Sequence, residues 1–212
     1  MVTEKNISST ERRGLRSDRP EGFSLIELLV VITVIAIVTG IAVFQFVNTR
    51  EAYNADDAAY KVMNYFREAY SRAVSDHHSF RVTINNSTGI ISLIDERTFG
   101  GISNGENLSG GAVLVKSEPL GVRVSLAQPT GVNPPPAPFN YAAATFPSNV
   151  WTGHFQSIGS VTDASGNPQS CTLFFQPSDR TNIPSLIRAV TVFGSSGSVR
   201  FWMYNGTQMV QG

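Results

Sequence analysis

A single charged residue lies inside the longest apolar run of this chain, and this placement constrains the fold more than any other feature. The run covers residues 23–44, which is 22 residues, and Glu27 is its only charged side chain. A helix rises ~1.5 Å per residue, so the run reaches roughly 33 Å, enough to cross the hydrocarbon core of a bilayer. A carboxylate at mid-membrane costs on the order of 2.5–3.5 kcal/mol, and less near an end of the span. Because a membrane anchor does not need this acid, Glu27 is a candidate functional residue.

The segment before the run, residues 1–22, is polar and rich in arginine, which predicts disorder and a cytoplasmic location. A secretory signal peptide fits poorly, because its apolar region is usually ~7–15 residues, lacks acids and ends in a small-x-small cleavage site. A twin-arginine signal also fits poorly, since Arg12 and Arg13 are not closely followed by an apolar run. Topology alone leaves a plain signal anchor open.

The order of residues 22–31, Gly-Phe-Ser-Leu-Ile-Glu-Leu-Leu-Val-Val, resembles the class III signal of type IV pilins and type II secretion pseudopilins. The resemblance implies that a prepilin peptidase cuts between Gly22 and Phe23 on the cytoplasmic side and methylates the new terminus at Phe23. Gly22 has no side chain, which leaves the backbone open to the peptidase. Residues 1–22 would then be a removed leader, and residues 23–47 a helix that spans the membrane and later lies in a filament core.

The same resemblance gives Glu27 a role in assembly. The α-amine exposed at Phe23 has a reference pKa of ~7.7–8.0 and stays cationic after methylation. Inside a filament, Glu27 of one subunit would neutralise the Phe23 amine of its neighbour, and pairing offsets much of the cost of burying each charge. Glu27 is therefore expected to set the register between subunits rather than to act as a catalytic acid.

Residues 48–76 continue the helix as an amphipathic segment. Gly and Pro are absent from residues 41–75, so a single helix over residues 23–76 is predicted. Two histidines, His77 and His78, follow it. No cluster of further metal ligands lies nearby in the sequence, so they are interpreted as a helix-end signal. The apolar stripe expected to face a core consists of Ala55, Ala59, Val62, Phe66, Ala69 and Ala73.

From residue 79 onward the apolar period changes from helical to alternating, so residues 77–212 are predicted to form a β-rich head. Turn signals separate the strand candidates, and no helix lies between them. The fold class is therefore α+β: a long N-terminal helix packed on an antiparallel β-sheet. The expected strands cover residues 80–84, 90–94, 112–115, 122–126, 153–158, 172–175, 187–193 and 199–204.

Two stretches are expected to be irregular. Residues 95–111 hold five glycines, and residues 128–148 hold six prolines. The proline tract could be a polyproline ligand, but a surface loop of the head is the preferred interpretation. Such loops usually carry sequence-specific contacts, although the sequence names no partner for either of them.

Residues 66–74 with the strand that follows, residues 155–159, and the C-terminal strand after Gly197 are similar to the GspH/FimT family of minor pilins and pseudopilins. Cys171 is the only cysteine, so the intramolecular disulfide common in major type IV pilins cannot form. Some FimT-like pilins use a Gly-Arg-x-Arg pattern for DNA. Here Arg200 matches its second arginine, whereas Ser198 replaces the first, so Arg200 is a candidate DNA contact.

Charge argues against nucleic acid as the main partner. The leader holds five of the sixteen Lys and Arg residues and four of the sixteen acids, so its removal leaves a formal charge of −1. DNA binding requires a basic patch, and only Arg188 and Arg200 are basic in the final 32 residues. DNA uptake and a major or adhesive subunit remain alternatives to a minor subunit that primes or tips the filament.

Catalytic and cofactor motifs are absent from the sequence, so no enzyme, metal or cofactor is expected. The stretch 163–167 resembles a calcium loop only in part, and a turn is the better interpretation. The resemblance implies as partners a prepilin peptidase, other pilins or pseudopilins, an inner-membrane assembly platform and membrane lipid. It places the chain in a bacterial inner membrane as a single-pass protein, with its N-terminus cytoplasmic and its head periplasmic, before it enters the filament.

Overall fold

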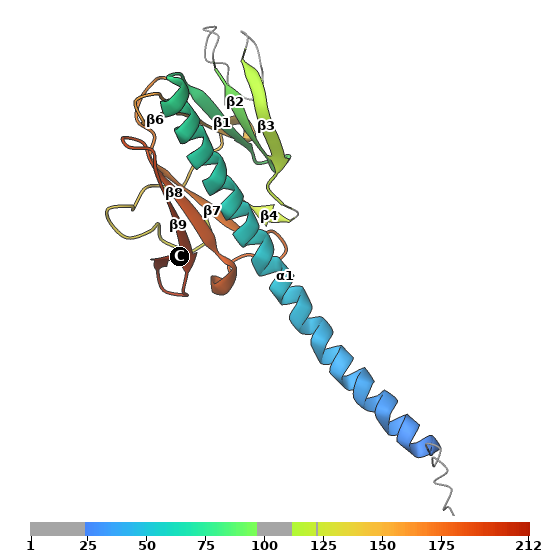
Figure 1. The fold of residues 1–212 in the computed structure, drawn as a ribbon. Coiled ribbons are helices and arrows are strands. Elements are labelled where there is room, and N and C mark those ends of the chain that lie inside the picture. Colours follow the sequence, from blue (N-terminus) through green and yellow to red (C-terminus); the bar gives the residue numbers. More distant parts are fainter. Residues whose placement is uncertain (1–23, 97–111, 122) are drawn as a thin grey trace, which may run out of the picture. The chain divides into compact units, whose positions relative to one another are not determined.

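The computed structural model describes residues 24–96, 112–121 and 123–212, except for the side chains of residues 43–52. One helix, α1 (Leu25–Asp76), contains 52 residues and is followed by strands (Figure 1). The chain forms two compact units, residues 1–44 and residues 45–212, which are described separately. The predicted class, α+β with antiparallel sheets, is confirmed.

The part of α1 in the first unit is apolar and unpacked. The segment Leu25–Ala42 is long and apolar enough to cross a membrane by length and composition, with a mean hydropathy of 2.7. None of this segment is buried within the chain itself. A surface of this kind requires lipid or another protein to cover it.

The second unit begins in α1, whose inner face is the predicted apolar stripe. All six residues of that stripe, from Ala55 to Ala73, are fully buried. The helix ends at Asp76, where the predicted helix also ends. His77 follows with φ 57°, the left-handed conformation typical of a helix C-terminus. His78 contacts Asp95, with 2.8 Å between its Nε2 and the carboxylate Oδ1.

Within the described residues, the antiparallel β structure expected for the head is divided into two five-stranded sheets. The first has the order β3-β2-β1-β5-β6, and the second has the order β10-β9-β8-β7-β4. The strands of the first sheet are β1 (Phe80–Asn85), β2 (Ile90–Asp95), β3 (Val113–Pro119), β5 (Val150–Phe155) and β6 (Val161–Thr162). Those of the second are β4 (Val124–Ser125), β7 (Cys171–Pro177), β8 (Arg188–Phe193), β9 (Ser198–Tyr204) and β10 (Met209–Gln211).

One hydrophobic core joins the helix stripe to both sheets. Phe66 of α1 packs against Trp151 and Phe155 of β5, with ring centroids 5.2 and 5.5 Å apart. Tyr60, one turn and a half earlier, stacks on Phe201 of β9 at 4.6 Å. Alternate residues of β1, β2, β7 and β8 fill the space between them. Burial of these side chains is the main stabilising term of the head.

The proline-rich loop, residues 128–148, is irregular as predicted, but it packs on the outer face of the second sheet. Phe139 contacts Trp202 of β9 at a centroid distance of 5.6 Å, and Tyr141 stacks on Phe193 of β8 at the same distance. Val132 joins the same cluster of buried residues. The loop therefore covers a second small core. The other expected loop, residues 95–111, lies largely outside the described residues, apart from Asp95 at the end of β2 and Glu96.

Several strand bounds differ from those predicted. The strand expected at residues 153–158 is β5, three residues earlier, because Val150 and Trp151 pair with Asn85 and Ile84 of β1. The chain then turns between Gln156 and Ser160, and Ile158 is 86% exposed in that turn. The strand expected at residues 122–126 is reduced to β4, although residue 122 itself is outside the described residues. The strand expected at residues 112–115 is the longer β3.

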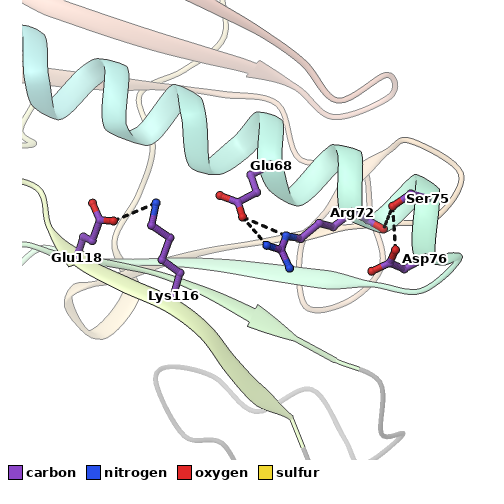
Figure 2. A network of polar contacts seen from close by, with 6 residues as sticks. All are labelled: Glu68, Arg72, Ser75, Asp76, Lys116 and Glu118. Atoms are coloured by element: carbon purple, nitrogen blue, oxygen red, sulfur yellow. Dashed lines mark hydrogen bonds and ion pairs between the residues drawn. The ribbon is translucent and has the colours of Figure 1, made fainter.

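Polar pairs lie on α1 and on β3 (Figure 2). Arg72 donates to Glu68 at 2.8 Å, and Lys116 of β3 pairs with Glu118 at 3.0 Å. The Lys116 ammonium also lies 4.8 Å from the centroid of the Tyr65 ring. Burial of Tyr65, together with the carboxylates of Glu118 and Glu68, raises the pKa of its phenol above the usual value. Each of these ion pairs lies within one element, so β3 is joined to the helix by the contact of Lys116 with the Tyr65 ring and by Lys61 Nζ, which donates to Pro119 O at 2.8 Å.

Candidate processing and assembly site

The site predicted from the sequence lies at the N-terminal end of α1. Gly22 and Phe23, the predicted cleavage and methylation positions, lie outside the described residues. Ser24 directly precedes the helix, and Glu27 lies in its first turn. The structure therefore describes the acid predicted to act in assembly and its surroundings within the helix, but not the bond predicted to be cut.

Glu27 is bound by Ser24 of the same chain. The Ser24 backbone N–H donates to Glu27 Oε2 at 2.8 Å, and the Ser24 hydroxyl donates to the same oxygen at 2.9 Å. In return, the Glu27 N–H donates to Ser24 Oγ at 3.3 Å. Ser24 O also accepts from the N–H of Leu28 at 3.2 Å. This reciprocal arrangement is a capping box, which satisfies backbone donors that the first helical turn would otherwise leave unpaired.

The capping box leaves part of the Glu27 carboxylate available. Both hydrogen bonds from Ser24 reach Oε2, while Oε1 accepts no hydrogen bond within the described residues. The side chains beside it, Leu25 and Leu28, are 83% and 60% exposed. A cation from another chain could therefore approach Oε1 while Ser24 continues to cap the helix. Carboxylates also accept more than two hydrogen bonds, so the two roles are compatible.

Ser24 is the residue at this site that the sequence analysis missed. The signal was present, because a serine followed three residues later by a glutamate, just before an apolar run, is the pattern of a capping box. The resemblance to the pilin signal gave Glu27 only the role of a partner for another subunit. The structure shows that this glutamate first completes the start of its own helix.

Arg200, the candidate DNA contact, lies on β9 with its side chain exposed. Its guanidinium lies 5.8 Å from the centroid of the Phe139 ring, in the proline-rich loop. Arg188, the other basic residue of the C-terminal region, is buried and bound to Asp56 of α1. The two arginines therefore do not form a joint basic patch.

The remaining polar candidates have structural roles. Asp163 accepts hydrogen bonds from the N–H groups of Ser165 and Asn167 at 2.8 and 2.9 Å, which closes the turn expected there. These bonds, that from Asn167 first, lower the pKa of the Asp163 carboxyl. A group of three or more His, Cys, Asp or Glu side chains suited to a metal is not found in the described part of the chain. Cys171 is buried and free.

Comparison with known proteins identifies one family model. Residues 19–43 match the prokaryotic N-terminal methylation motif, a stretch that contains Gly22, Phe23, Ser24 and Glu27. No curated protein and no solved structure matches the chain. The match supports a relationship to the type IV pilin-like proteins, which are structural subunits, and indicates a substrate of prepilin peptidase that is anchored through its N-terminal helix.

Proposed function

We propose that this chain is a minor pilin or pseudopilin of the GspH/FimT type, which primes or tips a type IV pilus or a type II secretion pseudopilus. The observation that carries the proposal is the motif match over residues 19–43. In this proposal the peptidase cuts between Gly22 and Phe23 and methylates Phe23. The processed chain is a single-pass protein of the inner membrane, with its head outside the cytoplasm.

One contact in the head supports the assignment to the GspH/FimT type. Tyr70 of α1 lies against two glycines with positive φ, Gly159 in the turn after β5 and Gly197 in the turn before β9. A Cβ built on Gly197 would lie 2.5 Å from Tyr70 Cδ2, and one built on Gly159 would lie 3.1 Å from the Tyr70 hydroxyl. The three segments that resemble the GspH/FimT family therefore meet at Tyr70, although they are far apart in the sequence.

Assembly is proposed to use Glu27 after it has capped its own helix. The free Oε1 would pair with the methylated amine of Phe23 in a neighbouring subunit, within the low-dielectric core of the filament. Neither charge is stable there alone, so the pair favours the register in which the two groups meet. Other pilins or pseudopilins and the inner-membrane assembly platform are the partners in this step.

Processing is tested by co-expressing the chain with a prepilin peptidase and measuring the intact mass. We expect loss of residues 1–22 and gain of one methyl group at Phe23. Gly22→Leu should block cleavage, because its side chain obstructs the backbone at the cut, whereas Gly40→Leu serves as the control within α1. Cleavage at another bond would contradict the assignment of Gly22 and Phe23.

Assembly is tested in cells that make the filament, by the amount of chain in the sheared filament fraction. Glu27→Ala should be processed and inserted normally but should fail to enter the filament. Thr33→Ala is the matched control, since it removes another polar group from the same apolar segment. Equal recovery of both variants would refute the role of Glu27.

A minor subunit should be far less abundant in this fraction than the main subunit, and abundance as the main component would identify a major subunit instead.

DNA binding is not favoured by the arrangement around Arg200. A gel shift with the processed chain in detergent, at two salt concentrations, distinguishes the alternatives, because phosphate-driven binding weakens steeply with salt. Salt-sensitive binding that is lost in Arg200→Ala would support the FimT-like alternative.

A further inference from the structure

A pocket of about 420 Å³ opens beside the first half of β5. Its volume lies within the ~300–1,000 Å³ typical of ligand sites in proteins. The lining includes three side-chain hydroxyls, one carboxylate and one carboxamide, contributed by segments on either side of β5. The lining residues are Thr145, Pro147, Ser148, Val150, Trp151, Thr152, Asp163, Ala164 and Gln169.

The edge of β5 that borders this pocket is only partly paired. β5 pairs with β1 along its whole length but with β6 only at His154 and Phe155. Beyond the paired part, the Gln156 N–H donates to Ser160 O at 2.8 Å, and at the start of the strand the Val150 N–H donates to Pro147 O. These bonds all lie on the edge away from β1.

Thr152 lies between these bonded positions. Main-chain groups of alternate residues in a strand point to the same edge, so the N–H and C=O of Thr152 also point away from β1. Neither group has a hydrogen-bond partner within the described residues. Unpaired main-chain groups at a sheet edge are a template for another extended chain.

The pocket lining carries a negative charge, and its hydroxyl, carboxamide and main-chain groups include both donors and acceptors. Among the described residues, Asp163 is the only charged one in the lining. The Gln169 side-chain oxygen is buried and has no hydrogen-bond partner within the described residues. Together with Thr152 C=O, these groups favour a ligand that donates hydrogen bonds and carries positive charge. Phosphates, carboxylates and nucleic acids are disfavoured, because their charge has the same sign as that of Asp163.

The walls of the pocket are fixed before any ligand arrives. The Gln169 N–H donates to Val161 O at 2.8 Å, and Gly194 lies so close that a Cβ there would be 2.5 Å from Gln169 N. On the opposite wall, Ser148 and Asn149 have φ values of 51° and 66°, an uncommon conformation for residues with side chains. A preformed site loses less conformational entropy on binding.

We propose that this pocket docks an extended segment of another protein chain, which pairs with the main chain of Thr152 and places a lysine or arginine side chain beside Asp163. A saccharide would satisfy the hydroxyl groups, but only a peptide offers an N–H and a C=O at the spacing of a strand. This docking role is independent of cleavage at Gly22 and of the assembly role of Glu27.

The test uses the ¹⁵N-labelled full chain in detergent micelles, titrated with the capped pentapeptide acetyl-Val-Lys-Val-Lys-Val-amide and followed by NMR. We expect the Thr152 amide resonance to shift on binding. Asp163→Asn should weaken binding about tenfold, because it removes one unit of charge but keeps an oxygen that can close the turn. The matched control, Asp179→Asn, removes an exposed carboxylate that pairs with Arg123 at 2.9 Å, and it should leave the affinity unchanged.

Two further peptides separate main-chain pairing from simple charge attraction. The peptide with Glu in place of Lys should bind at least about tenfold more weakly. A version of the Lys peptide N-methylated at the central valine, which lacks a main-chain donor, should also lose most of its affinity. Equal binding of the methylated and unmethylated peptides, absence of binding by the Lys peptide, or binding of a neutral disaccharide at Thr152 in its place would each overturn the proposal.

Discussion

Arg188 of β8 is bound to Asp56 in the head part of α1, and the two residues are 132 positions apart in the sequence. The Arg188 Nε donates to Asp56 Oδ1, and its Nη2 donates to Oδ2 at 3.4 Å. Its Nη1 donates to the carbonyl oxygens of Ser185 and Ile187 at 2.7 and 3.1 Å. The Arg188 side chain is only 10% exposed, so this pair joins the helix to the second sheet at a largely buried point.

Removal of Asp56 should destabilise the head. Asp56→Ala leaves the Arg188 cation buried without its counter-charge, and we expect a loss of about 2–4 kcal/mol in the free energy of unfolding. Arg188→Met should cost less, since the Asp56 side chain is 29% exposed and can be hydrated. Thermal unfolding in micelles, followed by circular dichroism, measures both effects.

The neighbouring Asp57→Ala, at a carboxylate that is 66% exposed, should change stability by no more than about 0.5 kcal/mol. Equal losses in Asp56→Ala and Asp57→Ala would refute the importance of the pair.

Gly197→Ala should be among the most damaging small substitutions in the head. Gly197 has φ 62°, and a Cβ there would lie 2.5 Å from Tyr70 Cδ2 and 2.9 Å from Gly159 O. The ring would have to move, and the backbone oxygen leaves little room, so we expect a loss of at least about 2 kcal/mol. Gly166→Ala is the control, because Gly166 has φ 84° with nothing within 4 Å, and it should cost about 1 kcal/mol. Urea unfolding compares the two variants, and a smaller loss at Gly197 than at Gly166 would contradict this account.

Tyr65→Phe should leave stability unchanged or raise it by about 1 kcal/mol. The Tyr65 hydroxyl is buried and has no hydrogen-bond partner within the described residues, so its removal ends an uncompensated desolvation cost.

Because burial raises the pKa of this phenol in the folded state, the unfolded chain ionises first as the pH rises above ~10. Wild type should therefore lose stability relative to Tyr65→Phe at alkaline pH. Thermal unfolding at pH 7 and at pH 10.5 measures the difference, and a large destabilisation at pH 7 would show that the hydroxyl has a partner.

The Cys171 thiol should be unreactive in the folded chain. It is 6% exposed, and burial raises its pKa to about 12. Since the thiolate is the reacting species, labelling by iodoacetamide at pH 8 should be about a thousandfold slower than in denaturant. Mass spectrometry of quenched samples gives both rates. Fast labelling of the folded chain would mean that this part of the core opens readily.

Ser24→Ala should loosen the first turn of α1 without preventing membrane insertion. It removes the hydroxyl that binds both the carboxylate and the N–H of Glu27, and loss of such a cap typically costs about 1 kcal/mol. Ser24→Thr keeps the hydroxyl and should behave like wild type. Hydrogen exchange of the Glu27 and Leu28 amides in micelles reports the effect. Unchanged exchange in Ser24→Ala would show that the cap contributes little to this helix end.

Local patterns predicted the helix and most of the strands because their information is contained in neighbouring residues. The period of Ala55, Ala59 and Val62 is helical whatever surrounds it, and all three are buried. The alternation in residues 80–84 and 90–94 similarly predicts β1 and β2, which pair across a short turn. In contrast, β6 and β10 have only two and three residues, too few to show a period, and β4 is a two-residue part of the strand expected at residues 122–126.

The candidate site divides in the same way. Glu27 lies within the apolar run, and the whole processing motif is one continuous stretch of sequence, so it could be recognised without a structure. The capping box is also a local pattern, because Ser24 and Glu27 are only three residues apart. The pocket beside β5 could not be predicted, because Thr145, Thr152, Asp163 and Gln169 come together only through pairing of strands.

By itself, the sequence determined the membrane-length helix, its amphipathic continuation, the processing motif and the α+β class, because each depends on order and period along a short stretch. Only the tertiary structure decided that the strands form two sheets around one helix, that Arg188 is neutralised by Asp56 while Arg200 is exposed, and that Thr152 remains unpaired at a sheet edge. These features depend on which distant strands pair and on which charged groups are desolvated. Both are determined by the packing of the whole head and not by any short stretch of sequence.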